Sequence, residues 1–119
     1  YVQQQGKDYE EVFAPVARVE SVRLLVALAA QFSWKMHHMD VKSAFLHGDL
    51  VEEVYVSQPP GFEVAGSDSK VFKLHKALYG LHQAPRTWNC KLDATLRELG
   101  FEKCPSDSGL YRKKEGSRC

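Results

Sequence analysis

Residues 21–32 carry the pattern that most constrains how this chain can fold. Apolar residues recur there at intervals of three and four, which is the period of one face of an α-helix. Ser21 stands at the start of the pattern, where its hydroxyl can accept a hydrogen bond from the free amides of a first helical turn. We therefore expect a helix over 21–32 whose apolar stripe is buried in the core. The stripe consists of Val22, Leu25, Val26, Ala29 and Phe32.

Three short segments predict β-strands. Apolar and polar residues alternate over 34–39, so this segment is expected to form a strand that ends at Asp40. Residues 51–57 alternate in the same way and are stopped by the diproline at Pro59–Pro60. A further short apolar segment, 71–74, follows a polar stretch rich in Gly and Ser.

The last third of the chain predicts a helix followed by a hairpin. Pro85 suits a first helical position because its missing amide costs nothing there, and Gly100 suits a left-handed helix end. Residues 101–104 and 109–112 then predict two strands around a turn at 105–107. This order of elements favours an antiparallel-rich α+β fold. The expected apolar face of the second helix is Trp88, Leu92, Thr95, Leu96 and Leu99.

Length and composition exclude several classes of protein. A chain of 119 residues fits one domain and can bury a core. With 44% hydrophobic and 26% charged residues, it is neither a disordered, a collagen-like nor a disulfide-scaffold sequence. The longest apolar run, Leu24–Ala30, is far shorter than the roughly 20 residues of a membrane span. We expect no membrane segment and no secretion leader, and we expect the chain to be part of a longer protein, because it starts with Tyr1 and stops in a polar run.

Charge and cysteine content leave two questions open. Residues 1–60 contain 5 Lys and Arg against 8 Asp and Glu, a net charge of −3, whereas residues 61–119 contain 11 against 7, a net charge of +4. This division is typical either of an acidic cleft beside a basic flank or of ordinary solvated surface. Three widely spaced cysteines, Cys90, Cys104 and Cys119, favour free thiols in a reducing compartment.

Common motifs for metal and phosphate chemistry are absent from the sequence. Five histidines and three cysteines suggest zinc, but no pair has the short spacing of known zinc sites. The glycine-rich loops that bind phosphate in nucleotide-binding folds and the elbow of serine hydrolases are missing too.

Two unusual segments remain. In the first, 39–46, a carboxylate at the end of a strand is followed by a turn with free amides and then an aromatic residue, which suits a divalent cation carrying phosphates. In the second, 78–88, Gly80 permits close backbone approach just before a helix begins. Taken alone, the first also fits a plain strand-ending Asp, and the second a plain lead-in to a helix.

Together and in this order, these segments resemble the reverse transcriptase of Ty1/copia-type long-terminal-repeat retrotransposons, over nearly the whole chain. The resemblance implies the fingers–palm portion of a right-hand polymerase, incomplete, with an antiparallel palm sheet packed on helices. Residues 1–34 would be the lead-in to fingers and palm, and 35–119 the palm with interspersed fingers elements. The motifs that carry the resemblance are Asp8-Tyr9-Glu10-Glu11-Val12-Phe13-Ala14-Pro15-Val16-Ala17-Arg18, His38-Met39-Asp40-Val41-Lys42-Ser43-Ala44-Phe45-Leu46-His47-Gly48 and Tyr55-Val56-Ser57-Gln58-Pro59-Pro60-Gly61-Phe62.

The resemblance also implies roles for single residues in the first motif region. Asp40 would bind both catalytic Mg²⁺ ions, with the backbone of Val41 as a further ligand. The amides of Ser43 and Ala44 would face the incoming triphosphate. Phe45 would stack under the sugar and exclude a ribose 2′-hydroxyl, although it also fits a plain core aromatic.

The second motif region has implied roles as well. Tyr79 and Gly80 would pack against the nascent base pair and the template. Lys76, Gln83 and Arg86 are candidates for nucleic-acid contact, and solvated surface explains each of them equally well. The implied partners are a primer–template duplex, deoxynucleoside triphosphates and the rest of a Pol polyprotein, in the cytoplasm, within a virus-like particle.

Two departures from the family pattern bear on activity. The family completes its metal site with a tandem Asp pair, and this sequence contains no Asp-Asp. The basic fingers segment that grips the triphosphate is missing too. We therefore expect these 119 residues to be inactive alone, because each Mg²⁺ ion needs several oxygen ligands. The alternatives are a catalytically dead element remnant, or a small nucleic-acid or protein interaction module that uses the same fold.

Overall fold

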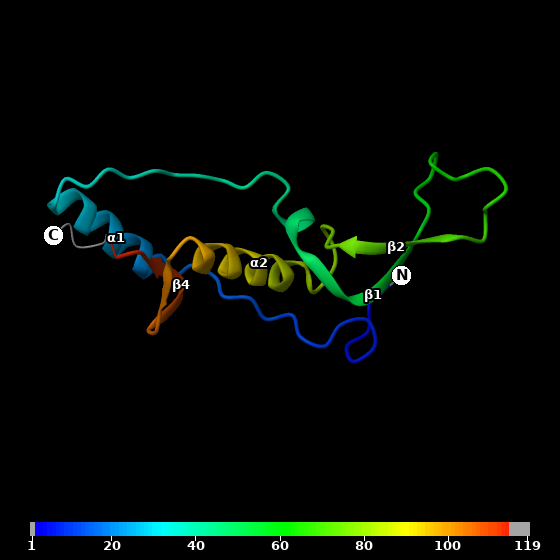
Figure 1. Ribbon diagram of the computed structural model, residues 1–119, viewed down its shortest axis with the longest axis horizontal. Helices are drawn as coiled ribbons and strands as arrows, with labels where there is room; N and C mark the ends of the chain where they lie inside the picture. The colour runs from blue at the N-terminus through cyan, green and yellow to red at the C-terminus, as the bar shows by residue number, and fades with distance from the viewer. Residues whose placement is uncertain (1, 115–119) are drawn as a thin grey trace. The chain divides into compact units, whose positions relative to one another are not determined.

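The computed structural model describes residues 2–114, which form two α-helices, one short 3₁₀ helix and four strands (Figure 1). In chain order these are α1 (Val19–Gln31), η1 (Ala44–His47), β1 (Asp49–Ser57), β2 (Val71–Lys76), α2 (Ala84–Glu98), β3 (Glu102–Cys104) and β4 (Asp107–Arg112).

The described chain divides into two compact units. The first contains residues 2–13 and 43–91, and the second contains residues 14–42 and 92–114. Helix α2 continues from one to the other, with residues 84–91 in the first unit and 92–98 in the second. Each unit is described by itself.

The hairpin of β1 and β2 forms the sheet of the first unit. The strands are antiparallel, with Val54 opposite Leu74 and Val56 opposite Phe72. Val54 is buried and Tyr55 is exposed, as the alternation over 51–57 predicts. Both strands are longer than predicted: β1 begins two residues earlier, and β2 extends to Lys76.

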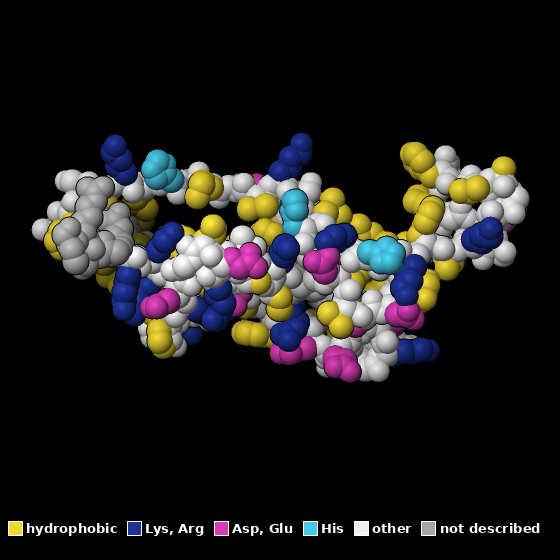
Figure 2. All heavy atoms as spheres, in the orientation of Figure 1, with side chains coloured by type: hydrophobic (Ala, Val, Ile, Leu, Met, Phe, Trp, Pro, Cys, Tyr) yellow, Lys and Arg dark blue, Asp and Glu magenta, His cyan; other side chains and the backbone are white. Residues whose placement is uncertain are grey.

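A long connection, residues 58–70, joins these two strands and is organised by one side chain. The Gln58 amide donates to the carbonyls of Ser67 and Lys70 at 2.8 and 3.1 Å, and its oxygen accepts from the Val64 amide at 2.8 Å. Hydrophobic side chains nevertheless remain at the surface of this connection (Figure 2), and Phe62 is 77% exposed. The connection is thus held from within by hydrogen bonds rather than by burial of its apolar residues.

The hairpin of β3 and β4 in the second unit is tied to the C-terminal half of α2 by Asp93. The Asp93 carboxylate accepts from the Tyr111 hydroxyl at 2.7 Å, from Arg97 at 2.8 Å and from Lys103 at 2.9 Å. These three donors, Tyr111 first, hold the pKa of the Asp93 carboxyl well below its usual range. The same carboxylate raises the pKa of Lys103. One side chain therefore links a helix to both strands of a hairpin.

Both predicted helices are present. Helix α2 ends as expected, because Gly100 adopts φ +84° and the amides of Gly100 and Phe101 bond back to the carbonyls of Arg97 and Leu96. Its predicted face is half-buried at Trp88, Leu92 and Leu96 but exposed at Thr95 and Leu99.

The start of α1 differs from the prediction. The helix begins at Val19 after Arg18, which makes no side-chain cap. Ser21 lies inside the first turn, and its hydroxyl bonds instead to the Asp107 carboxylate on β4. That bond lowers the pKa of Asp107. The Ser21 hydroxyl, which the sequence predicts to cap the helix, therefore bonds to a residue of another element instead.

The core expected on α1 is largely absent. Only Ala29 of the predicted stripe is buried, and Val22, Leu25, Val26 and Phe32 are between 38% and 59% exposed. The periodicity identifies the helix correctly but not the elements that cover it.

The expected strand over 34–39 is wrong. Residues 34–41 have no helix or strand assignment, and every residue from 34 to 41 is exposed. A strand exists only where its amides and carbonyls pair with a neighbour, and no segment within residues 2–114 pairs with this one. Asp40 consequently does not follow a strand.

The α+β class is as predicted, and the described residues form two two-stranded antiparallel sheets. The assignment of these elements to fingers and palm stays a prediction. The thiols of Cys90 and Cys104 are free, as predicted. Cys119 lies outside the described residues.

Candidate nucleotide-binding site

The segment that follows Asp40 makes a sharp turn into η1. Ser43 precedes η1 in the left-handed conformation, with φ 54° and ψ 41°. A non-glycine residue rarely adopts these angles, so the turn is a specific feature of this segment. Ser43, Ala44 and Phe45 are half-buried and belong to the first unit, whereas Asp40 and Val41 are exposed and belong to the second.

The structure brings together two predicted site residues from separate motifs. The ring of Phe45, on η1, lies 4.6 Å from the ring of Tyr79, centroid to centroid, at an angle of 46°. This geometry is typical of a stabilising aromatic pair. Phe45 is half-buried, but Tyr79 remains 65% exposed, so its ring is available to a ligand. Gly80 follows with φ +94° and open space where a Cβ would stand.

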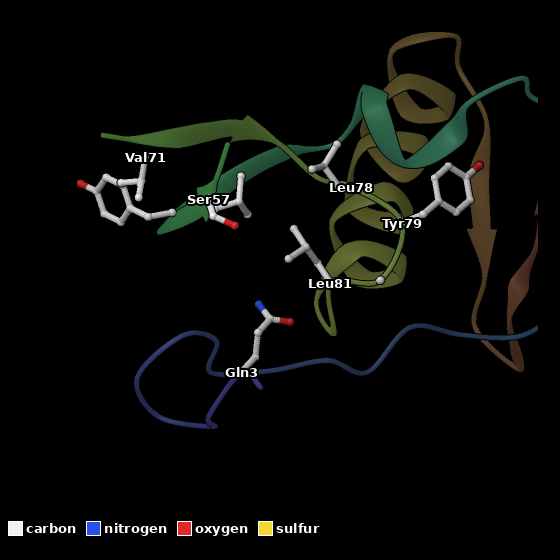
Figure 3. A pocket seen from close by; sticks show the side chains of 9 residues that line it. Gln3, Ser57, Val71, Leu78, Tyr79 and Leu81 are labelled. Carbon is white, nitrogen blue, oxygen red and sulfur yellow. The ribbon is translucent and has the colours of Figure 1, made fainter. Parts of the chain in front are cut away.

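A pocket of about 530 Å³ lies beside this turn and is lined from both β1–β2 and residues 78–81. In Figure 3 the side chain of Gln3 points from the N-terminal segment toward the pocket, and the side chain of Leu81 points into it from the turn. The ring of Tyr79 points away from the other labelled side chains. Leu78, Leu81 and the backbone of the 78–81 turn therefore line the pocket. The ring of Tyr79 lies on the side of the turn where it contacts Phe45.

The N-terminal segment supports the same turn, which the sequence did not indicate. The side-chain oxygen of Gln3 accepts from the backbone amide of His82 at 2.8 Å, and its amide donates to Gln83 at 3.0 Å. The rings of Tyr9 and His82 are 5.1 Å apart. No periodicity or motif signals such contacts between residues some 80 positions apart, because each depends on the tertiary fold.

The three candidates for nucleic-acid contact have different environments. Lys76 forms an ion pair with Asp49, which lowers the pKa of Asp49, and Arg86 forms one with Glu11 at 2.8 Å. Lys76 is exposed and Arg86 is half-buried, and ion pairs at a surface are easily exchanged for other anions. Gln83 is different, because only 1% of it is exposed and its side chain bonds within the protein. Gln83 therefore presents almost no surface to a ligand in this structure, and its contact with nucleic acid stays a prediction.

A complete magnesium site is not formed by the described residues. Among residues 2–114, no three side chains of the types His, Cys, Asp and Glu lie together in a way that could hold a metal ion. Magnesium requires several oxygen ligands at once, and Asp40 supplies a single carboxylate. In the same part of the chain, neither helix is long and apolar enough to span a bilayer.

Comparison with known proteins gives a consistent result. The family described as reverse transcriptase (RNA-dependent DNA polymerase) matches residues 1–119. The chain is 46% identical over 114 residues to the retrovirus-related Pol polyprotein from transposon TNT 1-94 of Nicotiana tabacum, covering 96% of the chain and 9% of that protein. It is 44% identical over 116 residues to the Pol polyprotein from transposon RE1 of Arabidopsis thaliana, covering 98% of the chain and 8% of that protein.

A yeast relative is also similar. The putative transposon Ty5-1 protein of Saccharomyces cerevisiae is 42% identical over 73 residues, covering 61% of the chain and 24% of that protein. No solved structure matches the chain. The chain thus spans less than a tenth of the plant polyproteins that it matches. Because the family match covers every residue from 1 to 119, this chain belongs to the reverse transcriptase (RNA-dependent DNA polymerase) family.

Proposed function

We propose that this chain is the nucleotide-binding part of a retrotransposon RNA-directed DNA polymerase, which adds deoxynucleotides to a primer 3′-hydroxyl. The observation that carries the proposal is the contact between Phe45 and Tyr79, at 4.6 Å. Each residue comes from a different motif of the family resemblance, and the resemblance assigns each of them to the nucleotide. The contact between the two rings supports a single nucleotide-binding site.

In this proposal the first unit binds the incoming nucleotide. Phe45 stacks under the deoxyribose, and its bulk leaves no room for a ribose 2′-hydroxyl. The amides of Ser43 and Ala44, at the turn into η1, donate to the triphosphate. Tyr79 and Gly80 pack against the nascent base pair, which the 65% exposure of the Tyr79 ring and the open space at Gly80 allow.

The metal site and the nucleic-acid contacts are also part of the proposal. Asp40 and the backbone carbonyl of Val41 supply oxygen ligands for magnesium, which activates the primer hydroxyl in this class of enzyme. The remaining carboxylate ligands come from outside the described residues. Lys76 and Arg86 exchange their carboxylate partners for phosphates of the primer–template duplex.

The partners in this proposal are the primer–template duplex, deoxynucleoside triphosphates and the rest of a Pol polyprotein, working in the particle of the element. They follow from the family and from relatives that are Pol polyproteins.

Primer extension with the polyprotein that carries this sequence tests the proposal. We expect Asp40→Asn to abolish extension, because a neutral amide is a poor ligand for magnesium. Asp68→Asn is the matched control, since Asp68 is also an exposed carboxylate, in the connection between β1 and β2. Extension should survive in this control.

A second variant tests the nucleotide site itself. Phe45→Ala should raise the incorporation of ribonucleotides relative to deoxynucleotides, because it removes the ring beneath the sugar. Equal discrimination by wild type and Phe45→Ala would refute the role of Phe45. A folded wild-type polyprotein that extends no primer would favour the alternative of a catalytically dead element remnant.

A further inference from the structure

Gln83 is the one polar side chain that is buried among residues 2–114, with 1% of its surface exposed. Removing a primary amide from water is unfavourable unless its hydrogen bonds are replaced. A buried glutamine therefore specifies its surroundings, because only a conformation that satisfies both ends of the amide is stable.

Both ends of the Gln83 amide are satisfied by the N-terminal segment. Its oxygen accepts from the side chain of Gln3 at 3.0 Å, and its nitrogen donates to the carbonyl of Asp8 at 3.3 Å. Gln3 in turn accepts from the backbone amide of His82 at 2.8 Å. We call these three hydrogen bonds the N-terminal clasp.

Apart from the Tyr9–His82 ring contact and the hydrogen bonds from Thr87 to the Gln83 carbonyl, the turn that the clasp holds, residues 78–83, is weakly bonded. Its own backbone hydrogen bonds are long, at 3.3 Å from the Leu81 amide to Leu78 and 3.2 Å from the Ala84 amide to Leu81. Gly80 adds conformational freedom in the middle of the turn. Tyr79, which reaches the Phe45 ring, is carried by this weakly bonded segment.

We propose that Gln83 is a positioning residue, which acts through Gln3 and Asp8 to hold the 78–83 turn so that Tyr79 stays against Phe45. Gln83 does not touch the nucleotide. Its effect on nucleotide binding rests on the function proposed above, whereas its effect on the turn does not. The clasp thereby gives the N-terminal segment a role in placing Tyr79.

Two variants and one matched control test this role. Gln83→Leu keeps a similar volume but leaves Gln3 and the Asp8 carbonyl without their partner. Gln3→Ala removes the other half of the clasp from a half-buried position, so it tests the proposal even if Gln83→Leu fails to fold. Gln58→Leu is the control, because Gln58 also makes three hydrogen bonds through its amide but in a different connection.

The first measurement is amide hydrogen exchange, which needs no nucleotide. Leaving a buried hydrogen-bonding group without its partner should speed exchange of the Leu81 and His82 amides by about 5- to 150-fold. The Tyr55 and Val56 amides on β1 should keep their rates. Gln58→Leu should instead speed exchange at Val64 and leave Leu81 and His82 unchanged.

The second measurement is the kinetics of primer extension by the polyprotein. A misplaced Tyr79 should raise KM for deoxynucleotides several-fold in Gln3→Ala and Gln83→Leu with little change in kcat, a split that general destabilisation does not produce. Unchanged exchange at Leu81 and His82 in both variants would overturn the positioning role, and so would an equal KM. If the wild type extends no primer, the proposed function fails and the exchange rates alone decide on the clasp.

Discussion

Gly48→Ala is expected to destabilise the first unit by a steric mechanism that the structure specifies. Gly48 has φ −83° and ψ 128°, which alanine adopts without strain, so the backbone alone would favour the substitution. An added Cβ, however, would stand 2.7 Å from the Thr87 methyl group, 3.1 Å from the Thr87 carbonyl carbon and 3.2 Å from the Trp88 nitrogen. Two of these three neighbours are backbone atoms of α2, which cannot rotate away.

The magnitude follows from two opposing contributions. Overpacking of this kind costs roughly 1–3 kcal/mol, while the reduced freedom of the unfolded chain returns about 0.4–1 kcal/mol. We expect a net loss of about 1–2 kcal/mol in the free energy of unfolding. Thr87→Ser in the same background removes the methyl group and should restore part of the loss, but not the part due to the backbone contacts.

The assay is exchange of the Ala77 amide, which donates to the Gly48 carbonyl at 2.9 Å and so reports on this junction directly. Protection of Ala77 should fall in Gly48→Ala and recover partly in the double variant with Thr87→Ser. Wild-type protection in Gly48→Ala would refute the steric argument. Complete recovery in the double variant would refute the contribution of the α2 backbone.

Two further predictions concern the second unit. Asp93→Asn should weaken the attachment of the β3–β4 hairpin to α2 by about 1.5–3 kcal/mol, because charged hydrogen bonds are lost. Since folding lowers the pKa of Asp93, its contribution is present above about pH 4 and is lost as the pH falls below that value, so urea unfolding curves of wild type and variant should converge in acid. Gly100→Ala should cost about 1 kcal/mol in the same assay, because Gly100 ends α2 at φ +84°.

Much of the local structure could be predicted because it depends on neighbouring residues. The helix ending at Gly100 and the hairpin of β3 and β4 follow from a short periodicity and from turn residues. The alternation that places Val54 inside and Tyr55 outside is local too. Each of these features depends on residues that are close together in the sequence, so a local pattern is enough to predict it.

The candidate site could be predicted only in part. The sequence indicated Phe45 and Tyr79 separately, and their contact depends on how η1 and the 78–83 turn pack. Gln83 shows the limit most clearly. Between His82 and Ala84 it has no sequence feature that separates a buried amide from an exposed one, and its partners lie 75 and 80 positions away.

The errors at 34–39 and at the α1 stripe have one physical cause. An alternating segment becomes a strand only beside a partner strand, and an apolar stripe becomes core only beneath another element. Residues 34–41 and α1 both belong to the second unit, and both expose the apolar side chains whose pattern suggested burial. A periodic apolar pattern predicts that one face of an element can be buried, but it does not identify the element that would cover that face.

The same cause predicts a measurable difference between the isolated chain and a longer protein. Residues 34–39 would form a strand if another segment of the polyprotein paired with them. In that case Trp34, which is 56% exposed here, should be buried in the polyprotein. Trp88→Phe removes the other tryptophan of these 119 residues, and any further tryptophans of the polyprotein are replaced too. Acrylamide should then quench the fluorescence of Trp34 strongly in the isolated chain and weakly in the polyprotein. Equal quenching would mean that 34–39 stays exposed in both, and Asp40 would then have no strand to fix it in a metal site.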